Sequence, residues 1–143
     1  MGANDDLTSR NTGSVPAFVA DPGMRLDVHH DGGTTIVAVS GEVDLMTADR
    51  LRETLLAEVA NRPTMLLVDL DGVEFLSSTG LAALALAHRA AVEGGVALSV
   101  VATSRVTLRP LQLTSMTEEL SVFASRADAL APRSGSEPSL RIG

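Results

Sequence analysis

The sequence predicts an α/β fold, in which a mixed, mostly parallel sheet of about five strands is accompanied by about four helices. Two observations support this prediction. Short segments of strand length, apolar or of alternating polarity, are followed by longer segments of helical periodicity along the chain. The first two strands are separated only by a glycine-containing turn. Strands joined by crossover helices run parallel, whereas a hairpin adds an antiparallel edge. A length of 143 residues suffices for one domain with its own core.

The opening hairpin is predicted over residues 24–39. Residues 24–30 alternate in polarity, residues 35–39 are apolar, and Asp31, Gly32 and Gly33 form the turn between them. A helix is expected next, capped by Thr47 and ending at Ala60. Its apolar residues recur at spacings of three and four, which is the helical period: Ala48, Leu51, Leu55 and Val59.

Two near-continuous apolar runs, residues 65–70 and 96–101, are typical of strands that are covered on both faces. We expect Asp71 and Gly72 to end the first of these strands. The segment between the runs predicts a helix over residues 79–93, ended by Gly94 and Gly95. This helix is apolar nearly all round, so we expect little of it to face water.

The last part of the domain shows a weaker pattern. Pro110 removes a backbone donor, so a helix after Ser104 is expected to kink or to start late, near Arg109. A short strand over residues 120–123 and a short helix over residues 126–130, capped by Ser125, complete the domain. Residues 1–22 and 132–143 lack periodicity, and we expect them to be flexible tails around a domain of residues 23–131.

The composition excludes several classes of function. The chain has no cysteine, and all of its basic residues are arginine, which removes disulfides, cysteine zinc sites, lysine Schiff bases and Gly-Lys-Ser/Thr phosphate loops. The net charge of -7 argues against nucleic acid as a partner, because such binding needs a basic face. No apolar run is long enough to cross a bilayer and no signal peptide is visible, so we expect a cytoplasmic protein.

The histidines do not indicate a catalytic or metal site. His29 and His30 point to opposite faces of a strand, so they do not form a metal-ligand pair. His88 follows Ser78 by ten residues on the same predicted helix and cannot reach it, which leaves a serine hydrolase without a base. We therefore expect no metal, no cofactor and no catalytic residue.

Three consecutive hydroxyl residues, Ser77, Ser78 and Thr79, precede Gly80 at the start of the predicted helix over residues 79–93. One hydroxyl is enough to cap a helix, because its oxygen accepts an amide that has no partner in the first turn. The remaining hydroxyls stand where free amides and the helix dipole favour an anion. The fold would therefore tolerate a phosphate at this position.

These residues resemble a known family, the STAS domains of bacterial anti-anti-sigma factors, also called anti-sigma factor antagonists. Residues 41–51 read GEVDLMTADRL and resemble the family's Gly-Glu-(Leu/Val)-Asp followed by Thr-Ala. Residues 74–81 read EFLSSTGL and resemble its Phe-(hydrophobic)-Asp-Ser-(Ser/Thr)-Gly-Leu, and residues 111–116, LQLTSM, are similar to its Leu-x-Leu-Thr-Gly-Leu. The likeness extends over about residues 24–130, with the elements in the expected order.

The resemblance implies a switch rather than an enzyme. Such a protein binds an anti-sigma factor that has a serine-kinase fold, and thereby frees a sigma factor for transcription. In the family, the anti-sigma factor phosphorylates the serine after the motif Asp, which corresponds to Ser78, and the two proteins then dissociate. A phosphatase that resets the switch is a further implied partner, and Gly80 is expected to let a partner's backbone approach closely. The implied partner-binding residues are Glu42, Asp44, Thr47, Ser77, Ser78, Thr79 and Gly80.

The sequence departs from the family pattern at three positions. Ser77 stands in place of the motif Asp, Ser115 in place of a glycine, and Pro110 interrupts a helix that the family keeps regular. Serine can keep the capping role of the motif Asp but not its charge. This departure leaves open an alternative function, a ligand-sensing or scaffold STAS module that is not phosphorylated.

Overall fold

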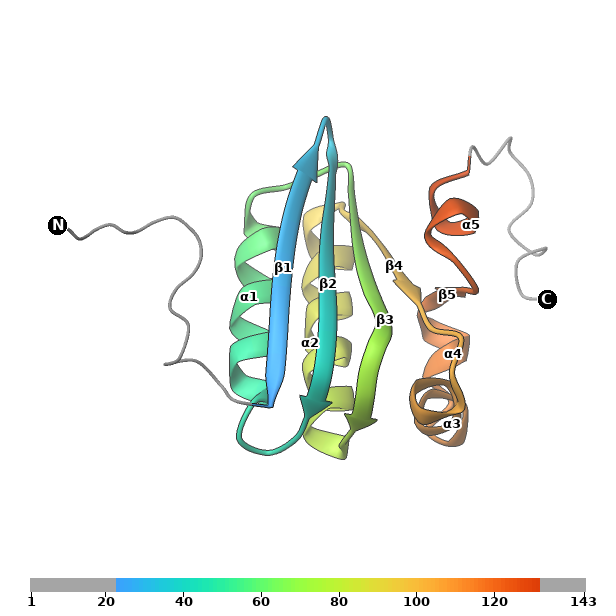
Figure 1. The fold of residues 1–143 in the computed structure, drawn as a ribbon. Coiled ribbons are helices and arrows are strands. Elements are labelled where there is room, and N and C mark those ends of the chain that lie inside the picture. Colours follow the sequence, from blue (N-terminus) through green and yellow to red (C-terminus); the bar gives the residue numbers. More distant parts are fainter. Residues whose placement is uncertain (1–22, 132–143) are drawn as a thin grey trace, which may run out of the picture.

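A five-stranded sheet with the strand order β1-β2-β3-β4-β5 forms the centre of the computed structural model, which describes residues 23–131 (Figure 1). The strands are β1 (Met24–Asp31), β2 (Thr34–Val43), β3 (Met65–Leu76), β4 (Ala97–Val101) and β5 (Ser121–Phe123). The helices are α1 (Ala48–Ala60), α2 (Ser78–Gly94), α3 (Arg105–Leu113), α4 (Met116–Glu119) and α5 (Arg126–Leu130). The predicted tails, residues 1–22 and 132–143, lie outside the described residues.

The pairing of the strands confirms the predicted mixed sheet. β1 pairs with β2 antiparallel, and the other neighbouring strands pair parallel. The turn between β1 and β2 contains Gly32, whose φ of 62° is a left-handed conformation that glycine adopts without strain. The opening hairpin therefore forms the antiparallel edge that the sequence predicts.

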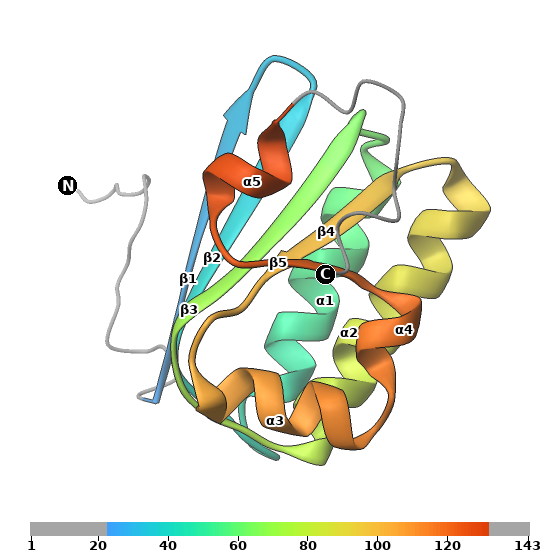
Figure 2. The same ribbon diagram turned by 90° about the vertical axis from the view of Figure 1, so that its right-hand side faces the viewer.

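Helices α1 and α2 lie side by side on one face of the sheet (Figures 1 and 2). The main core lies between these two layers and is aliphatic: its fully buried members include Val37, Leu51, Leu55, Leu66, Val68 and Leu84. A smaller cluster on the opposite face joins Leu67 and Val101 of the sheet to Ala129 of α5. Burial of such side chains contributes about 1.5–3 kcal/mol each relative to exposure, so the aliphatic core explains how the fold is stable with few aromatic residues.

Strand β3 is longer than the sequence indicates. The expectation that Asp71 and Gly72 end it is wrong, because the strand continues to Leu76. The register between β2 and β3 shifts here, and Gly72 pairs with Ser40. A Cβ atom on Gly72 would lie 2.8 Å from the Cβ of Ser40, so the glycine permits a close approach at a bulge instead of ending the strand. The extension carries β3 to the beginning of α2.

Helix α2 is more exposed than expected. Its boundaries agree with the prediction, and Gly95 ends it in a left-handed conformation with a φ of 73°. However, one side of the helix faces solvent along its whole length, with these exposed residues: Ala82, Leu86, Arg89, Val92 and Glu93. The expectation that little of α2 faces water is therefore wrong, because no third layer of residues 23–131 covers the outer side of the two helices.

The C-terminal part of the domain contains one further correction. Helix α3 begins at Arg105 and includes Pro110, so the expected late start near Arg109 is wrong. Thr107 and Leu111 are fully buried, and this burial offsets the backbone hydrogen bond that the proline removes. The short helix α5 agrees with the prediction, since the Oγ of Ser125 accepts a hydrogen bond from the backbone N–H of Asp128. In the part of the chain that the structure describes, no helix is long and apolar enough to cross a membrane.

Candidate functional site

The two motifs that the sequence singles out meet at one end of the sheet, where β2 and β3 end and α1 and α2 begin (Figure 1). In the parallel ladder, Glu42 pairs with Phe75 and Val43 pairs with Leu76. The backbone N–H of Ser77 then donates to the carbonyl oxygen of Val43 at 2.9 Å. These contacts place the loop between β2 and α1 beside the first turn of α2.

The three hydroxyls at the start of α2 have different environments. Ser77 is the N-cap, and its Oγ accepts a hydrogen bond from the backbone N–H of Gly80 at 3.2 Å. The hydroxyls of Ser77 and Thr79 lie 2.8 Å apart and bond to each other, and both residues are half-buried. Ser78 is exposed, and its hydroxyl has no hydrogen-bond partner within residues 23–131. Only the Ser78 hydroxyl of these three is both accessible and free to react.

The N-terminus of α2 favours an anion at Ser78. The first turn of α2 contains no acidic residue, and its amides and the helix dipole stabilise a negative group by about 0.3–1 kcal/mol. Ser77 fulfils the capping function without adding a negative charge next to Ser78. A phosphate on Ser78 would thus extend from the surface at the positive end of a helix.

The loop that carries Asp44 is closed by its own hydrogen bonds. One carboxylate oxygen of Asp44 accepts hydrogen bonds from the backbone N–H groups of Met46 and Thr47, at 3.0 and 3.1 Å. The Thr47 hydroxyl accepts from the backbone N–H of Asp44 and donates to the carbonyl oxygen of Glu42, both at 2.9 Å. Thr47 occupies the N-cap position of α1, but its hydroxyl does not cap the helix, so the expected capping role is wrong. Its hydroxyl holds the loop in shape instead.

The glycines of the two motifs serve internal packing. Gly80 is buried, and a Cβ atom there would lie 2.6 Å from a methyl carbon of Val43 and 2.8 Å from one of Leu76. The expectation that Gly80 admits a partner's backbone is therefore corrected, because the side without a side chain faces the protein interior. Gly41 has a φ of 88°, and a Cβ atom there would lie 2.1 Å from the carbonyl oxygen of Gly23, so only glycine fits this position.

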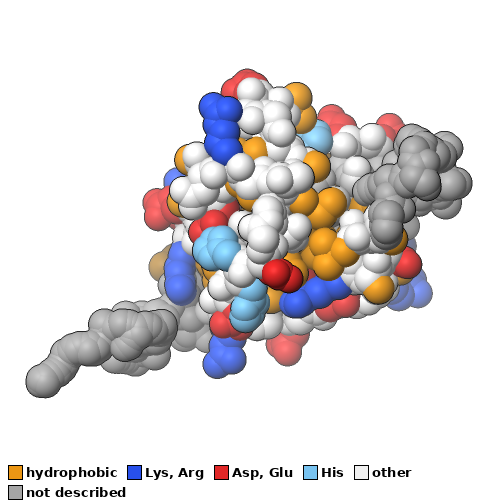
Figure 3. All heavy atoms as spheres, turned by 90° about the horizontal axis from the view of Figure 1, so that it is seen from above, with side chains coloured by type: hydrophobic (Ala, Val, Ile, Leu, Met, Phe, Trp, Pro, Cys, Tyr) orange, Lys and Arg blue, Asp and Glu red, His pale blue; other side chains and the backbone are white. Residues whose placement is uncertain are grey.

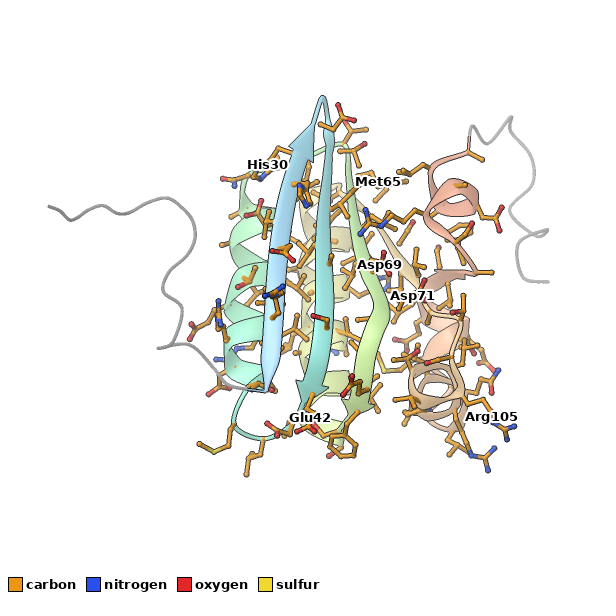
Figure 4. All side chains as sticks on the ribbon, viewed as in Figure 1. His30, Glu42, Met65, Asp69, Asp71 and Arg105 are labelled. Atoms are coloured by element: carbon orange, nitrogen blue, oxygen red, sulfur yellow. The ribbon has the colours of Figure 1, made fainter. Side chains whose placement is uncertain are left out.

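Three large apolar side chains at this end were missed by the sequence analysis. Leu45 and Met46, in the loop between β2 and α1, are 73% and 82% exposed, and Phe75, near the end of β3, is 51% exposed. Phe75 pairs with Glu42, which Figure 4 labels at the lower end of β2. The available signal was the position of Leu45 and Met46 between Asp44 and Thr47, in a loop too short to bury them. Large apolar side chains that stay exposed on segments next to Ser78 point to an interaction surface.

The histidines lie away from the hydroxyl cluster. His29 and His30 are exposed near the hairpin turn, at the opposite end of the sheet from Ser78 (Figures 3 and 4). His30 Nε2 forms a 2.9 Å hydrogen bond with a carboxylate oxygen of Glu58 on α1. Among the described residues, no three histidine, aspartate or glutamate side chains are grouped in a way that could hold a metal ion.

Comparison with known proteins identifies the family. The sequence model of the STAS domain matches residues 25–129. The chain belongs to the STAS domain family. This confirms the resemblance that the motifs carry, and residues 25–129 include both sides of the site described above.

Named relatives of this STAS domain are anti-sigma factor antagonists. The anti-sigma-F factor antagonist RsfB of Mycobacterium tuberculosis is 37% identical over 111 residues, which are 78% of this chain and 90% of RsfB. The crystal structure of an anti-sigma factor antagonist from Mycobacterium paratuberculosis is 35% identical, with a TM-score of 0.72, and covers 78% of this chain and 95% of its own.

More distant structures share the fold. SpoIIAA, an anti-sigma factor antagonist, in its unphosphorylated form has a TM-score of 0.62 and 14% identity, with coverage of 74% of this chain and 93% of its own. The Bacillus SpoIIAA in its phosphorylated form has a TM-score of 0.58 and 14% identity, with coverage of 74% and 96%. At this identity the comparison shows the STAS fold alone.

Proposed function

We propose that this STAS domain protein is an anti-sigma factor antagonist that is switched by phosphorylation at Ser78. It binds an anti-sigma factor with a serine-kinase fold, and the sigma factor held by that protein is thereby released. Phosphorylation of Ser78 by the bound partner then dissociates the complex. The protein acts in this scheme as a substrate and a switch, not as an enzyme.

The observation that carries the proposal is the environment of Ser78. Its hydroxyl is exposed, has no hydrogen-bond partner in the described part of the chain, and stands at the first residue of α2. It also occupies the position that the family phosphorylates, while the adjacent Ser77 supplies the helix cap. The free hydroxyl and the capping hydroxyl are thus separate groups, so modification of Ser78 leaves the cap intact.

The charge change explains how the complex would end. A phosphoserine carries about -1.5 to -2 at neutral pH and three acceptor oxygens. In the middle of an interface, such a dianion must be desolvated or paired, and an unpaired one costs more than a transient complex supplies. The unmodified hydroxyl is small and neutral, so the same surface docks. A loss of affinity is sufficient, and the STAS domain itself need not rearrange.

The partner-binding residues divide into two groups by their burial. Glu42 and Ser78 are exposed, and Asp44, Ser77 and Thr79 are half-buried, so these five reach the surface. Thr47 and Gly80 are buried and act from within: Thr47 holds the loop, and Gly80 allows α2 to pack closely on Val43 and Leu76. We propose that substitutions at the two buried positions affect binding through the shape of the site.

Two relatives support this proposal. RsfB, which is similar over most of its length, is by name an anti-sigma-F factor antagonist. Bacillus SpoIIAA, which shares the fold alone, is known in a phosphorylated form, so a STAS fold can carry a phosphate. A phosphatase that removes the phosphate from Ser78 completes the proposed cycle.

Mass spectrometry of a kinase reaction tests this function. The full chain is incubated with ATP and each purified serine-kinase anti-sigma factor of its own organism, and the modified residue is located by peptide mapping. We expect the mass of one phosphate at Ser78, no modification of Ser78→Ala, and a phosphate that is still located at Ser78 in Thr79→Ala. A stable complex without a mass shift favours the scaffold alternative, which the replacement of the motif Asp by Ser77 leaves open.

A further inference from the structure

We infer that Leu45, Met46 and Phe75 form an apolar anchor by which the anti-sigma factor recognises this protein. The anchor is distinct from the Ser78 hydroxyl, whose phosphorylation dissociates the complex. The inference rests on the proposed function and adds the chemistry of the partner. It predicts that the anti-sigma factor presents an apolar hollow beside the site from which it transfers phosphate to Ser78. The name apolar anchor refers below to these three side chains.

The exposure of the anchor is unusual for this protein. Five large apolar side chains in the described part of the chain are more than half exposed. Leu45 and Met46 are neighbours in the loop between β2 and α1, and Phe75 stands two residues before the cap Ser77. Protein interfaces draw much of their binding energy from a few large side chains, most often Trp, Tyr and Arg. This chain has no Trp and no Tyr, so Phe is the only aromatic side chain that it offers, and Leu45 and Met46 are large aliphatic side chains exposed near Phe75 in the fold.

The anchor is held in place before any partner binds. The carboxylate of Asp44 and the buried hydroxyl of Thr47 tie the loop together through four hydrogen bonds to its backbone. Leu45 and Met46 therefore cannot fold back onto the core, and they remain presented to solvent. A preorganised group loses less conformational entropy on binding, and the unbranched side chain of Met46 adapts to the shape of a hollow.

The anchor is also linked to Ser78 through the backbone. Phe75 lies two residues before the cap Ser77, and Leu45 lies two residues after Val43, whose carbonyl oxygen accepts the Ser77 amide. A kinase domain that brings its active site to Ser78 must cover this end of the sheet, and with it the anchor. The apolar anchor and Ser78 would thus be covered by the same bound partner.

This arrangement assigns two functions to two kinds of group. The anchor determines which anti-sigma factor binds and how tightly, because an apolar hollow of matching shape is required. Ser78 determines when the complex dissociates. A phosphate on Ser78 would have to be desolvated while the anchor is buried in the interface, and this desolvation costs free energy. Substitution of the anchor is therefore expected to weaken binding even when Ser78 is unmodified.

Calorimetric titration with the purified serine-kinase anti-sigma factors of the same organism tests the inference. The variants are Leu45→Ser/Met46→Ser and Phe75→Ser in the full chain. Val92→Ser is the matched control, because Val92 is 64% exposed on α2 near the end that is far from Ser78. All these side chains lie at the surface, so thermal unfolding is expected to remain close to that of the wild type. We expect the double variant to lose about 30-fold or more in affinity, and the control to change by about twofold or less.

The outcomes separate this inference from the function on which it rests. If Ser78→Glu abolishes binding while both anchor variants bind as tightly as the wild type, the anchor is wrong and the switch stands. If no anti-sigma factor binds or modifies the wild type, the proposed function fails and the anchor fails with it. Sedimentation gives a further check: a wild-type dimer that the double variant converts to monomer assigns the anchor to a second copy of this chain and overturns the inference.

Discussion

The Oγ of Ser77 accepts a hydrogen bond from the backbone N–H of Gly80 at 3.2 Å, and this bond distinguishes the capping hydroxyl of the site from the exposed hydroxyl of Ser78. Ser77 also bonds to the hydroxyl of Thr79. Ser78 lies between them in the sequence, forms no hydrogen bond with either through its hydroxyl, and is the exposed member of the three. The STAS domain can therefore change the charge at Ser78 without losing the cap of α2.

The first prediction concerns this cap. Ser77→Ala is expected to lower the free energy of unfolding by about 1 kcal/mol, because the amide of Gly80 loses its partner. Ser78→Ala is the control, and its effect should stay within about 0.5 kcal/mol. Urea denaturation of both variants measures the difference. Equal effects of the two substitutions would show that the capping assignment is wrong.

Thr47 is predicted to support the loop through its hydroxyl. Thr47→Val keeps the shape of the side chain but leaves the amide of Asp44 and the carbonyl oxygen of Glu42 without this partner. We expect a loss of about 1–3 kcal/mol in the free energy of unfolding and faster hydrogen exchange at the amide of Met46. The matched control is Thr54→Val on α1, which should have little effect on either measurement. Unchanged exchange at Met46 would contradict the role given to Thr47.

The contact between α2 and the ends of β2 and β3 is predicted to require Gly80. Gly80→Ala introduces a Cβ atom 2.6 Å from Val43 and 2.8 Å from Leu76, and the expected loss in the free energy of unfolding is about 1–3 kcal/mol. Gly94→Ala lies on the same helix, where the nearest atom is 4.0 Å away on Val59, so no loss is expected there. Guanidinium denaturation compares the two variants. A Gly80→Ala protein as stable as Gly94→Ala would refute the packing role.

Ser115 is predicted to be a point of backbone strain. It has a φ of 62°, a left-handed conformation that favours glycine, and the motif that residues 111–116 resemble has glycine there. Ser115→Gly should therefore raise the free energy of unfolding by about 0.5–1 kcal/mol, whereas Ser115→Val should lower it. Thermal unfolding of both variants tests the sign. A lower melting temperature for Ser115→Gly would mean that the serine side chain contributes something that the backbone does not reveal.

Local pattern was sufficient to predict most of the fold. The hairpin turn, α1, α2, β4 and α5 lie where periodicity and turn residues place them, because each of these signals reflects a short-range property of the chain. Strand β2 continues past the predicted Val39 to Val43. The continuation of β3 past Asp71 and Gly72 was not predictable in this way. It depends on the close approach of Gly72 to Ser40, two residues that are distant in the sequence.

The candidate site shows the same limit. The hydroxyl cluster could be found from the sequence, and so could the capping by one of its members. The sequence could not show that Thr47 bonds back to Glu42, or that Gly80 faces Val43, because both contacts arise only when β2 and α2 meet. The exposure of Phe75 was hidden for a related reason, since it depends on the unexpected length of β3.

The central claim is that a negative charge at Ser78 is tolerated by the STAS domain but not by its complex with the anti-sigma factor. The most direct measurement is the affinity of a serine-kinase anti-sigma factor for Ser78→Ala and for Ser78→Glu in one calorimetric experiment. We predict that Ser78→Ala binds as the wild type does, and that Ser78→Glu binds at least about tenfold more weakly with an unchanged melting temperature. Equal affinity of the two variants would contradict the claim.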